Sequence, residues 1–344
     1  MEQRLTELWY RESAGFSFLQ PLSWLYGLVT RLRRAAYARG WFRTQRAGKP
    51  VIVVGNLTVG GTGKTPVVAW LAEQLSLSGL KVGIVSRGYG RSKRQPEAVH
   101  AESSWQDVGD EPMLLWQLTG CDVVVAQDRF AGAQKLVALG VDVIIADDGL
   151  QHLRLARDCE IVVIDGARGF GNGRLLPAGP LREPVSRIRY ASIVVVNGVP
   201  EHASLQAGEG KLSPASLQMS LAGGVAHRLD GLAAPELLEH FSGQRVHAVA
   251  GIGNPGRFFR YLRGCGIDVV EHPFPDHHPF TAADLTFGDT LPVLMTQKDA
   301  VRCRELENAR LWYVPVVARF SEPRARELLE RVVRTLAPAS SGPS

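Results

Sequence analysis

The stretch VIVVGNLTVGGTGKT, from Val51 to Thr65, decides the fold. Its β-branched start predicts a buried strand, and the apolar pattern from Lys64 to Leu77 predicts a helix. The glycines between them let successive backbone N–H groups face one anion, toward which the helix also points its positive end. This order predicts a phosphate-binding loop, with Thr58 where the strict pattern has glycine. The alternative is a chance glycine-rich turn.

Residues of this turn, and the acids after a later strand, predict where a nucleotide and its metal bind. Lys64 would reach the terminal phosphates, and the Thr65 hydroxyl would coordinate Mg²⁺. The strand VDVIIA runs into Asp147 and Asp148, which suit a Walker-B role at the same metal, although an Asp-Gly turn is the alternative. The ligands expected are ATP and Mg²⁺, and the residues expected at the phosphates are Gly60, Gly61, Thr62, Gly63, Lys64 and Thr65.

Further apolar runs alternate with helical patterns, which is typical of a doubly wound α/β fold with a mostly parallel sheet. A stretch rich in Gly, Ser, Ala and Pro then separates a second, smaller α/β lobe, whose last strand is expected at 311–317. The predicted division is a helical, membrane-associating segment at 1–45, a phosphate-loop core at 46–200, a linker or exposed loop at 201–216, the second lobe at 217–336 and a disordered tail at 337–344.

Charge is distributed unevenly along the 344 residues, whose net charge is +5. No Asp or Glu occurs from Ser13 to Ala72, a span with many Arg and Lys residues, so the partner should be anionic: nucleic acid, a membrane surface or a phosphorylated substrate. The uncharged, aromatic stretch from Ser13 to Thr30 is too polar for a spanning helix, but with the arginines after it suits the headgroup layer. The alternative is an amphipathic helix on the protein's own core. Four scattered cysteines indicate neither a disulfide framework nor a structural zinc site.

Several short motifs follow one another from about residue 10 to about residue 330, and their ordered combination is specific. They are TVGGTGKTP (58–66), SRGYGR (86–91), GDEP (109–112), DDGLQH (147–152), GRLLPAGPLREP (173–184), FPDHHPF (274–280) and TQKDAVR (296–302). Together they resemble the tetraacyldisaccharide 4'-kinase family. The resemblance implies a membrane-associated kinase that transfers the γ-phosphate of ATP to the 4'-hydroxyl of a tetraacylated glucosamine disaccharide 1-phosphate, giving lipid IVA, a lipid A precursor.

The resemblance also implies site residues. Asp110 would be the general base, paired with His277, which Asp276 would orient; His278 is the neighbouring alternative. Without the resemblance, Asp110 reads as a helix N-cap and the histidines as part of a surface loop. The residues expected at the substrate, chiefly as phosphate-binding guanidinium groups, are Arg87, Arg91, Glu111, Arg129, Gln151, Arg174 and Arg182.

The predicted setting is the cytoplasmic face of a bacterial inner membrane, with a glycolipid substrate, no nucleic acid and no obligate protein partner. Two other functions remain open from the residues alone. One is a P-loop GTPase or ATPase switch, since TQKD at 296–299 loosely resembles a guanine-reading tetrapeptide. The other is a nucleic-acid-binding protein that uses the basic N-terminal part, although no recognition module is evident.

Overall fold

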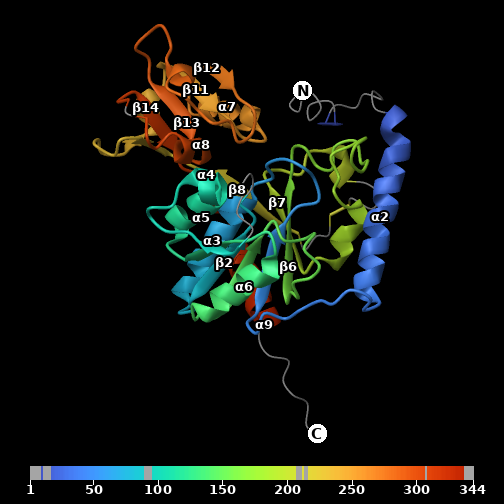
Figure 1. Ribbon diagram of the computed structural model, residues 1–344. Helices are drawn as coiled ribbons and strands as arrows, with labels where there is room; N and C mark the ends of the chain where they lie inside the picture. The colour runs from blue at the N-terminus through green and yellow to red at the C-terminus, as the bar shows by residue number, and fades with distance from the viewer. Residues whose placement is uncertain are drawn as a thin grey trace.

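A computed structural model describes residues 9–10, 17–88, 95–206, 211–212, 216–306 and 308–336. Arg91, the tail expected at 337–344 and parts of the expected linker (207–210 and 213–215) lie outside the described residues, as does most of the chain before α2. The structure has two lobes: a large one that carries the phosphate loop, and a smaller one beside α4 (Trp105–Val108) and α5 (Asp110–Thr119) (Figure 1).

The large lobe is built on a sheet of nine strands in the order β15-β8-β7-β6-β1-β5-β2-β4-β3. The strands from β8 to β4 in this order pair in parallel, and β3 and β15 pair antiparallel at the two edges. This confirms the expected doubly wound, mostly parallel sheet. The bounds are β1 Val51–Gly55, β2 Val82–Ser86, β3 Glu97–Ala98, β4 Asp122–Val125, β5 Val143–Asp147, β6 Cys159–Asp165, β7 Ile193–Asn197, β8 Leu217–Ala222 and β15 Val317–Arg319.

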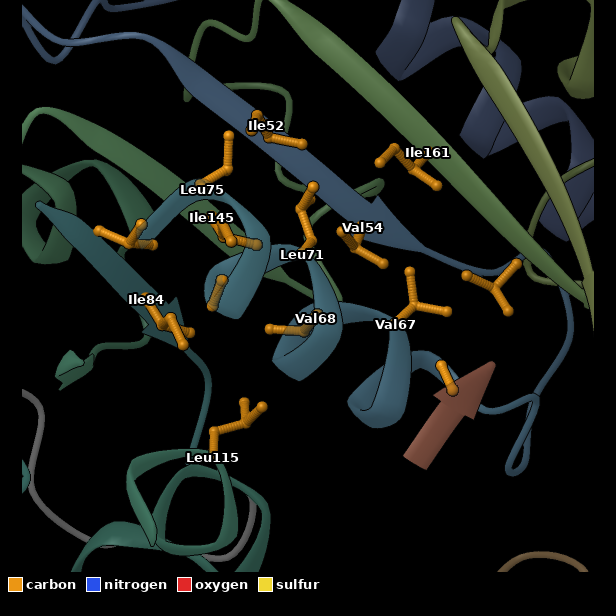
Figure 2. Close-up of a cluster of buried hydrophobic side chains, with 14 of the residues drawn as sticks. Ile52, Val54, Val67, Val68, Leu71, Leu75, Ile84, Leu115, Ile145 and Ile161 are labelled. Atoms are coloured by element: carbon orange, nitrogen blue, oxygen red, sulfur yellow. The ribbon is translucent and has the colours of Figure 1, made fainter. Parts of the chain in front are cut away.

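Helices cover the sheet because its strands are apolar on both faces. Helix α3 (Lys64–Leu77) buries Val67, Val68 and Leu71 against one face, together with residues of α5 and α9 (Glu322–Leu336) (Figure 2). Helix α6 (Arg129–Ala138) packs on the other face. Helix α2 (Gln20–Ala38) stands along the outside of the large lobe (Figure 1).

Replacing Leu71 by alanine should lower the free energy of unfolding of the large lobe by about 2 to 5 kcal/mol, because the side chain is fully buried and leaves a cavity. Chemical denaturation of the Leu71→Ala variant measures the loss. The control is Leu77→Ala at the end of the same helix, where the side chain is 76% exposed. Equal midpoints for the two variants would contradict the packing described for α3.

The small lobe has a sheet in the order β10-β9-β14-β13-β11-β12. Strands β14, β13, β11 and β12 are parallel, and β9 and β10 add antiparallel pairs. The bounds are β9 Val225–Arg228, β10 Glu236–Leu237, β11 Arg245–Ala250, α7 Pro255–Gly264, β12 Asp268–Pro273, β13 Val293–Thr296, α8 Gln297–Arg302 and β14 Leu311–Val314.

The chain returns to the large lobe after β14, which corrects the expected second lobe at 217–336. Strand β8 pairs with β7, β15 pairs with β8, and α9 packs against β6 and β8. The single strand expected at 311–317 is therefore wrong: it is divided between the two sheets. Pro315 lies at the division and cannot donate a backbone hydrogen bond to a ladder.

Candidate active site

The phosphate loop joins β1 to α3 and contains two residues in the left-handed region, Gly60 (φ +93°) and Gly63 (φ +94°). A Cβ on Gly63 would lie 2.3 Å from the Nδ2 atom of Asn197, and that amide donates a 2.9 Å hydrogen bond to the Thr62 carbonyl. Only glycine therefore allows Asn197, at the end of β7, to support the loop from behind.

The first half of the loop pairs with the segment Pro180–Arg182. The N–H of Val59 donates to the Pro180 carbonyl at 2.9 Å, and that of Arg182 donates to the Leu57 carbonyl at 2.7 Å. Thr58 forms an antiparallel bridge with Leu181 between these two bonds. This bridge explains how the loop accommodates threonine where the strict pattern has glycine.

Charged side chains converge beside the loop at Asp148, the residue after β5. The Arg182 guanidinium donates hydrogen bonds to both carboxylate oxygens of Asp148, at 2.9 and 2.8 Å. The Lys64 ammonium lies 3.8 Å from Asp148 Oδ1. Lys64 also donates to Asn56 Oδ1 at 3.1 Å. Burial acts to raise the pKa of Asp148, but Lys64 and Arg182 outweigh it and hold this pKa well below its usual range.

Asp147, the last residue of β5, is the acid whose environment best fits a metal ion. Its side chain is buried, and its Oδ2 accepts a 2.9 Å hydrogen bond from the Ser86 hydroxyl. Burial and the nearby Glu111 and Asp148 charges raise the pKa of Asp147 to about 6 against the opposing effect of Lys64. A buried carboxylate in this position would be stabilised by Mg²⁺, which proteins hold with one or two carboxylates plus substrate phosphates. Within the described residues no cluster of three or more His, Cys, Asp or Glu side chains could hold a metal alone.

Asp110 and His277, which are 167 positions apart, meet where the two lobes touch. The Nδ1 atom of His277 lies 2.9 and 3.0 Å from the two carboxylate oxygens of Asp110. Asp110 begins α5 in the large lobe and is 4% exposed, and His277 lies in the loop after β12 in the small lobe. His277 is one of two described non-glycine residues with positive φ, at 61°, so its neighbours must hold it in this conformation.

The loop carrying His277 is connected to the phosphate loop through the backbone. The N–H of His277 donates to the Gly251 carbonyl at 3.3 Å. Two residues further along, Gly253 packs so closely on the phosphate loop that a Cβ there would lie 2.6 Å from the Gly61 nitrogen. The Asp110–His277 pair and the phosphate loop therefore belong to one site formed by both lobes.

The neighbours of His277 have different roles. Asp276 accepts a hydrogen bond from the His277 backbone N–H at 3.1 Å, and its carboxylate lies 3.8 Å from His277 Nε2. His278 lies 3.3 Å from Asp284 Oδ2, and its ring centre is 4.7 Å from that of Phe274. Of the two adjacent histidines, the structure therefore brings His277 to Asp110.

The pairing should be measurable as a change in the pKa of His277. Burial acts to lower this pKa, but the hydrogen bond with Asp110 and the negative charges of Asp110 and Asp276 together outweigh it and raise the pKa. Burial likewise acts to raise the pKa of Asp110, but the bond with His277 and the charges of Lys298 and Arg302 bring it down to about 2. We expect the pKa of His277, measured by NMR, to fall in the Asp110→Asn variant, because the carboxylate charge is lost.

The same pairing predicts how stability depends on pH. The contribution of Asp110 is complete above its unfolded pKa of about 3.9 and is lost as the pH falls through about 2. The contribution of His277 is complete below its unfolded pKa of about 6.5 and is lost as the pH rises through its raised folded value. An unchanged His277 titration in Asp110→Asn would contradict both statements.

The side chains expected at the substrate differ in where they lie and in what they contact. Arg182 lies at Asp148, as described, and the Gln151 amide donates to Glu183 Oε1 at 2.7 Å. Arg87 is exposed and Arg174 is half-buried. Arg129 differs from the expectation, because its guanidinium is buried and donates to the backbone carbonyls of Ala126 and Asp147. Its geometry suits bracing the end of β5 more than binding a substrate phosphate.

Sequence reasoning missed several residues that complete the site. They include Asn56 and Asn197 at the phosphate loop and Glu183 next to Arg182. Lys298 donates to Glu111 Oε1 at 2.9 Å, and Arg302 Nε lies 3.7 Å from Asp110 Oδ2. The signal for the last two was the motif TQKDAVR, which carries both residues.

Comparisons with known proteins identify the family of this chain. The model of the family described as "LpxK: Tetraacyldisaccharide-1-P 4'-kinase" matches residues 16–334. The chain is 52% identical to the tetraacyldisaccharide 4'-kinase of Alkalilimnicola ehrlichii over 91% of both chains, and 48% identical to that of Pseudomonas putida over 92% of both. The crystal structure of LpxK from Aquifex aeolicus in complex with ATP superposes with a TM-score of 0.74 at 30% identity, covering 93% of this chain and 99% of that one. The resemblance predicted from the motifs is confirmed: this chain belongs to the tetraacyldisaccharide 4'-kinase family.

Proposed function

We propose that this kinase uses Asp110 and His277 to activate the hydroxyl of its lipid acceptor for attack on ATP. Its activity is the ATP-dependent phosphorylation of the 4'-hydroxyl of a tetraacylated glucosamine disaccharide 1-phosphate, which gives lipid IVA in lipid A biosynthesis. The observation that carries the assignment of roles is the Asp110–His277 pair, which the two lobes form together next to the phosphate loop.

The reaction forms a bond between the 4'-oxygen and the γ-phosphorus and breaks the bond from that phosphorus to the bridging oxygen, so that ADP leaves. The proton of the hydroxyl passes to the Asp110–His277 pair, with Asp110 ionised at neutral pH because its pKa is about 2. Lys64 and the N–H groups of the phosphate loop stabilise the charge on the transferred group. The contacts of Arg182 and Lys64 with Asp148 keep these cations beside the loop before the nucleotide binds.

Asp147, Asp148 and Thr65 would hold Mg²⁺ in this site. The burial of Asp147 and its raised pKa favour a cation there, whereas Asp148 would first have to release part of its contact with Arg182. When bound, the ion would neutralise negative charge on the phosphates of the nucleotide. Asp147, with Ser86 donating to it, is the side chain of this chain that is best prepared for that role.

Helix α2 supports an acceptor that remains in a membrane. Its small and polar residues face the protein: Ser23 donates to the Leu175 carbonyl at 2.8 Å, and a Cβ on Gly27 would lie 2.7 Å from Leu175 Cδ1. Its large apolar residues face outward, with Trp24 68% and Leu28 52% exposed. This is the reverse of a helix packed on its own core, and the arginines that follow suit anionic headgroups.

The same helix contacts residues of the site, and these contacts would place the bilayer surface next to the site. The Tyr26 hydroxyl donates to the Arg182 carbonyl at 3.0 Å, and Arg34 lies 3.6 Å from Glu183. No helix in the described part of the chain has both the length and the apolar character needed to cross a bilayer. The exposed apolar residues of α2 support attachment from one side, which we place at the cytoplasmic face of the inner membrane, where ATP is present.

Replacing Trp24 and Leu28 together by glutamate should reduce binding to anionic vesicles at least about 10-fold, because each apolar side chain contributes about 1.5 to 3 kcal/mol when buried. Co-sedimentation with vesicles measures the change. The control is Val333→Glu on α9, where the side chain is 49% exposed on another surface of the lobe. Equal sedimentation of the double variant and the control would remove α2 from membrane binding.

The acceptor itself can be tested with an analogue that lacks one hydroxyl. With ATP and Mg²⁺, we expect tetraacyldisaccharide 1-phosphate to gain one phosphate, detected by mass spectrometry, while its 4'-deoxy analogue gains none. Phosphorylation of the analogue would show that another hydroxyl is attacked and would overturn the proposed positioning of the acceptor.

A further inference from the structure

Lys298 is the one side chain in the described residues that the hydrogen bonds place against the immediate neighbours of both Asp110 and His277. Its ammonium donates to Glu111 Oε1 at 2.9 Å and to Asp276 Oδ1 at 3.2 Å. Glu111 follows Asp110 in the large lobe, and Asp276 precedes His277 in the small lobe. One cation therefore connects the two halves of the pair across the lobe boundary.

The environment of Lys298 is that of a mostly buried ion pair and differs from that of a mobile ion pair at the surface. The side chain is 15% exposed, so its ion pairs are screened less than those at the surface. Its burial acts to lower the pKa of Lys298, but Glu111, Asp110 and Asp276 outweigh this and raise it. The lysine is therefore charged at neutral pH.

The first turn of α8 is held by hydrogen bonds, which fix the position of the Lys298 backbone. The adjacent Asp299 is fully buried, and its carboxylate accepts from the Thr296 hydroxyl and from the Gly251 N–H. Arg302, one turn further, pairs with the same carboxylate and donates to the Gly251 carbonyl at 2.9 Å. Gly251 also accepts from the His277 N–H, so α8 and the loop of His277 share one anchor.

We propose that Lys298 is a positioning residue that clamps Glu111 of the large lobe to Asp276 of the small lobe and thereby holds Asp110 against His277. The proposal rests on the roles proposed above for that pair. It gives a reason for the positive φ of His277, since the residue just before it is fixed from the other side. It also gives the lysine of TQKD a function that involves no guanine base.

The clamp should also influence how the pair titrates. The charged groups around His277 are Asp110 and Glu111 from α5, Asp276 from its own loop, and Lys298 and Arg302 from α8. The positive charge of Lys298 lowers the pKa of both Asp110 and His277. Removing this charge should raise both pKa values. As the pH is lowered, activity should therefore be lost at a higher pH than in the wild type.

The test compares Lys298→Met with Lys298→Arg, with Lys81→Met as the matched control. Lys81 pairs with Asp122 at 3.3 Å on the surface, at the opposite end of the strands. For Lys298→Met we expect kcat to fall about 10- to 100-fold, because small displacements of reacting groups are costly, while the KM for ATP changes less than about twofold. The acid limb of kcat/KM should move to higher pH. Lys298→Arg should keep the limb in place and retain most of the turnover.

A wild-type kcat and pH profile for Lys298→Met would overturn the proposal, and so would a Lys298→Arg variant as damaged as Lys298→Met. If Lys298→Met does not fold, as judged by circular dichroism, the exposed Asp276→Asn variant provides the test. It should lower kcat, because Lys298 then loses the charged partner in the small lobe; equal activity of Asp276→Asn and wild type would contradict the clamp. Asp110→Ala separates the two proposals: if it is inactive while Lys298→Met is normal, only the clamp fails, and if it is fully active, the proposed base itself fails.

Discussion

Replacing Asp110 by alanine is expected to lower kcat by about 100- to 10,000-fold, the usual contribution of a positioned general base. Asp110 is the buried partner of His277, so the variant loses the carboxylate that accepts the proton and the group that orients the imidazole. The KM for ATP should change little, because the phosphate loop and Lys64 remain. The measurement is steady-state turnover with saturating ATP and varied lipid acceptor.

Three further variants make this result specific. Asp107→Ala removes an exposed carboxylate three residues earlier, on α4, and should leave kcat within about twofold of the wild type. His277→Ala should give a loss similar to that of Asp110→Ala, and the double variant should be little worse, since groups that act as a unit are not additive. Normal turnover by Asp110→Ala would remove Asp110 from the mechanism.

Replacing Lys64 by methionine is expected to lower kcat/KM for ATP at least about 100-fold, as when one preorganised charge donor is lost. The Lys64 ammonium lies 3.1 Å from Asn56 Oδ1 and 3.8 Å from Asp148 Oδ1, so it is already held beside the loop. Its loss also leaves Asp148 with one fewer cation, although Arg182 remains on both carboxylate oxygens. Nucleotide titration and turnover should therefore both be affected.

The Lys64→Arg variant should regain little of the lost kcat/KM for ATP, because a planar guanidinium does not occupy the position of a compact ammonium. Lys81→Met is the matched control, since it removes a lysine that pairs only at the surface of the same lobe. Turnover and ATP affinity in Lys64→Met equal to those in Lys81→Met would show that the loop does not hold the phosphates in the way proposed.

The large sheet was predictable because its signals are local. The apolar run Val51–Gly55, the glycines after it and the apolar pattern of α3 specify one another within a short segment. The return of the chain was not predictable from such patterns. Strand β8 could pair with either sheet, and only packing in three dimensions places β15 and α9 on the large lobe.

The site was predictable to a similar extent. Lys64, Asp147 and Asp148 follow from the order strand, loop and helix. Asp110 and His277 could be suspected only through the family resemblance, because nothing local indicates a contact across 167 positions. Arg129 was expected at the substrate because guanidinium groups suit phosphate binding, and no local signal indicated that it would donate to the buried carbonyls of Ala126 and Asp147. Lys298 was missed because its partners lie far apart in the sequence, Glu111 on α5 and Asp276 in the loop after β12.

The central claim is that the loop before Lys64 delivers a phosphoryl group to a lipid hydroxyl held between the two lobes. Its most direct test follows the label of [γ-³²P]ATP with and without tetraacyldisaccharide 1-phosphate. We predict that the label enters the lipid when the acceptor is present and that little inorganic phosphate is released when it is absent. Rapid release of labelled phosphate without lipid, with no labelled lipid in its presence, would contradict the account and favour a nucleotide-hydrolysing switch.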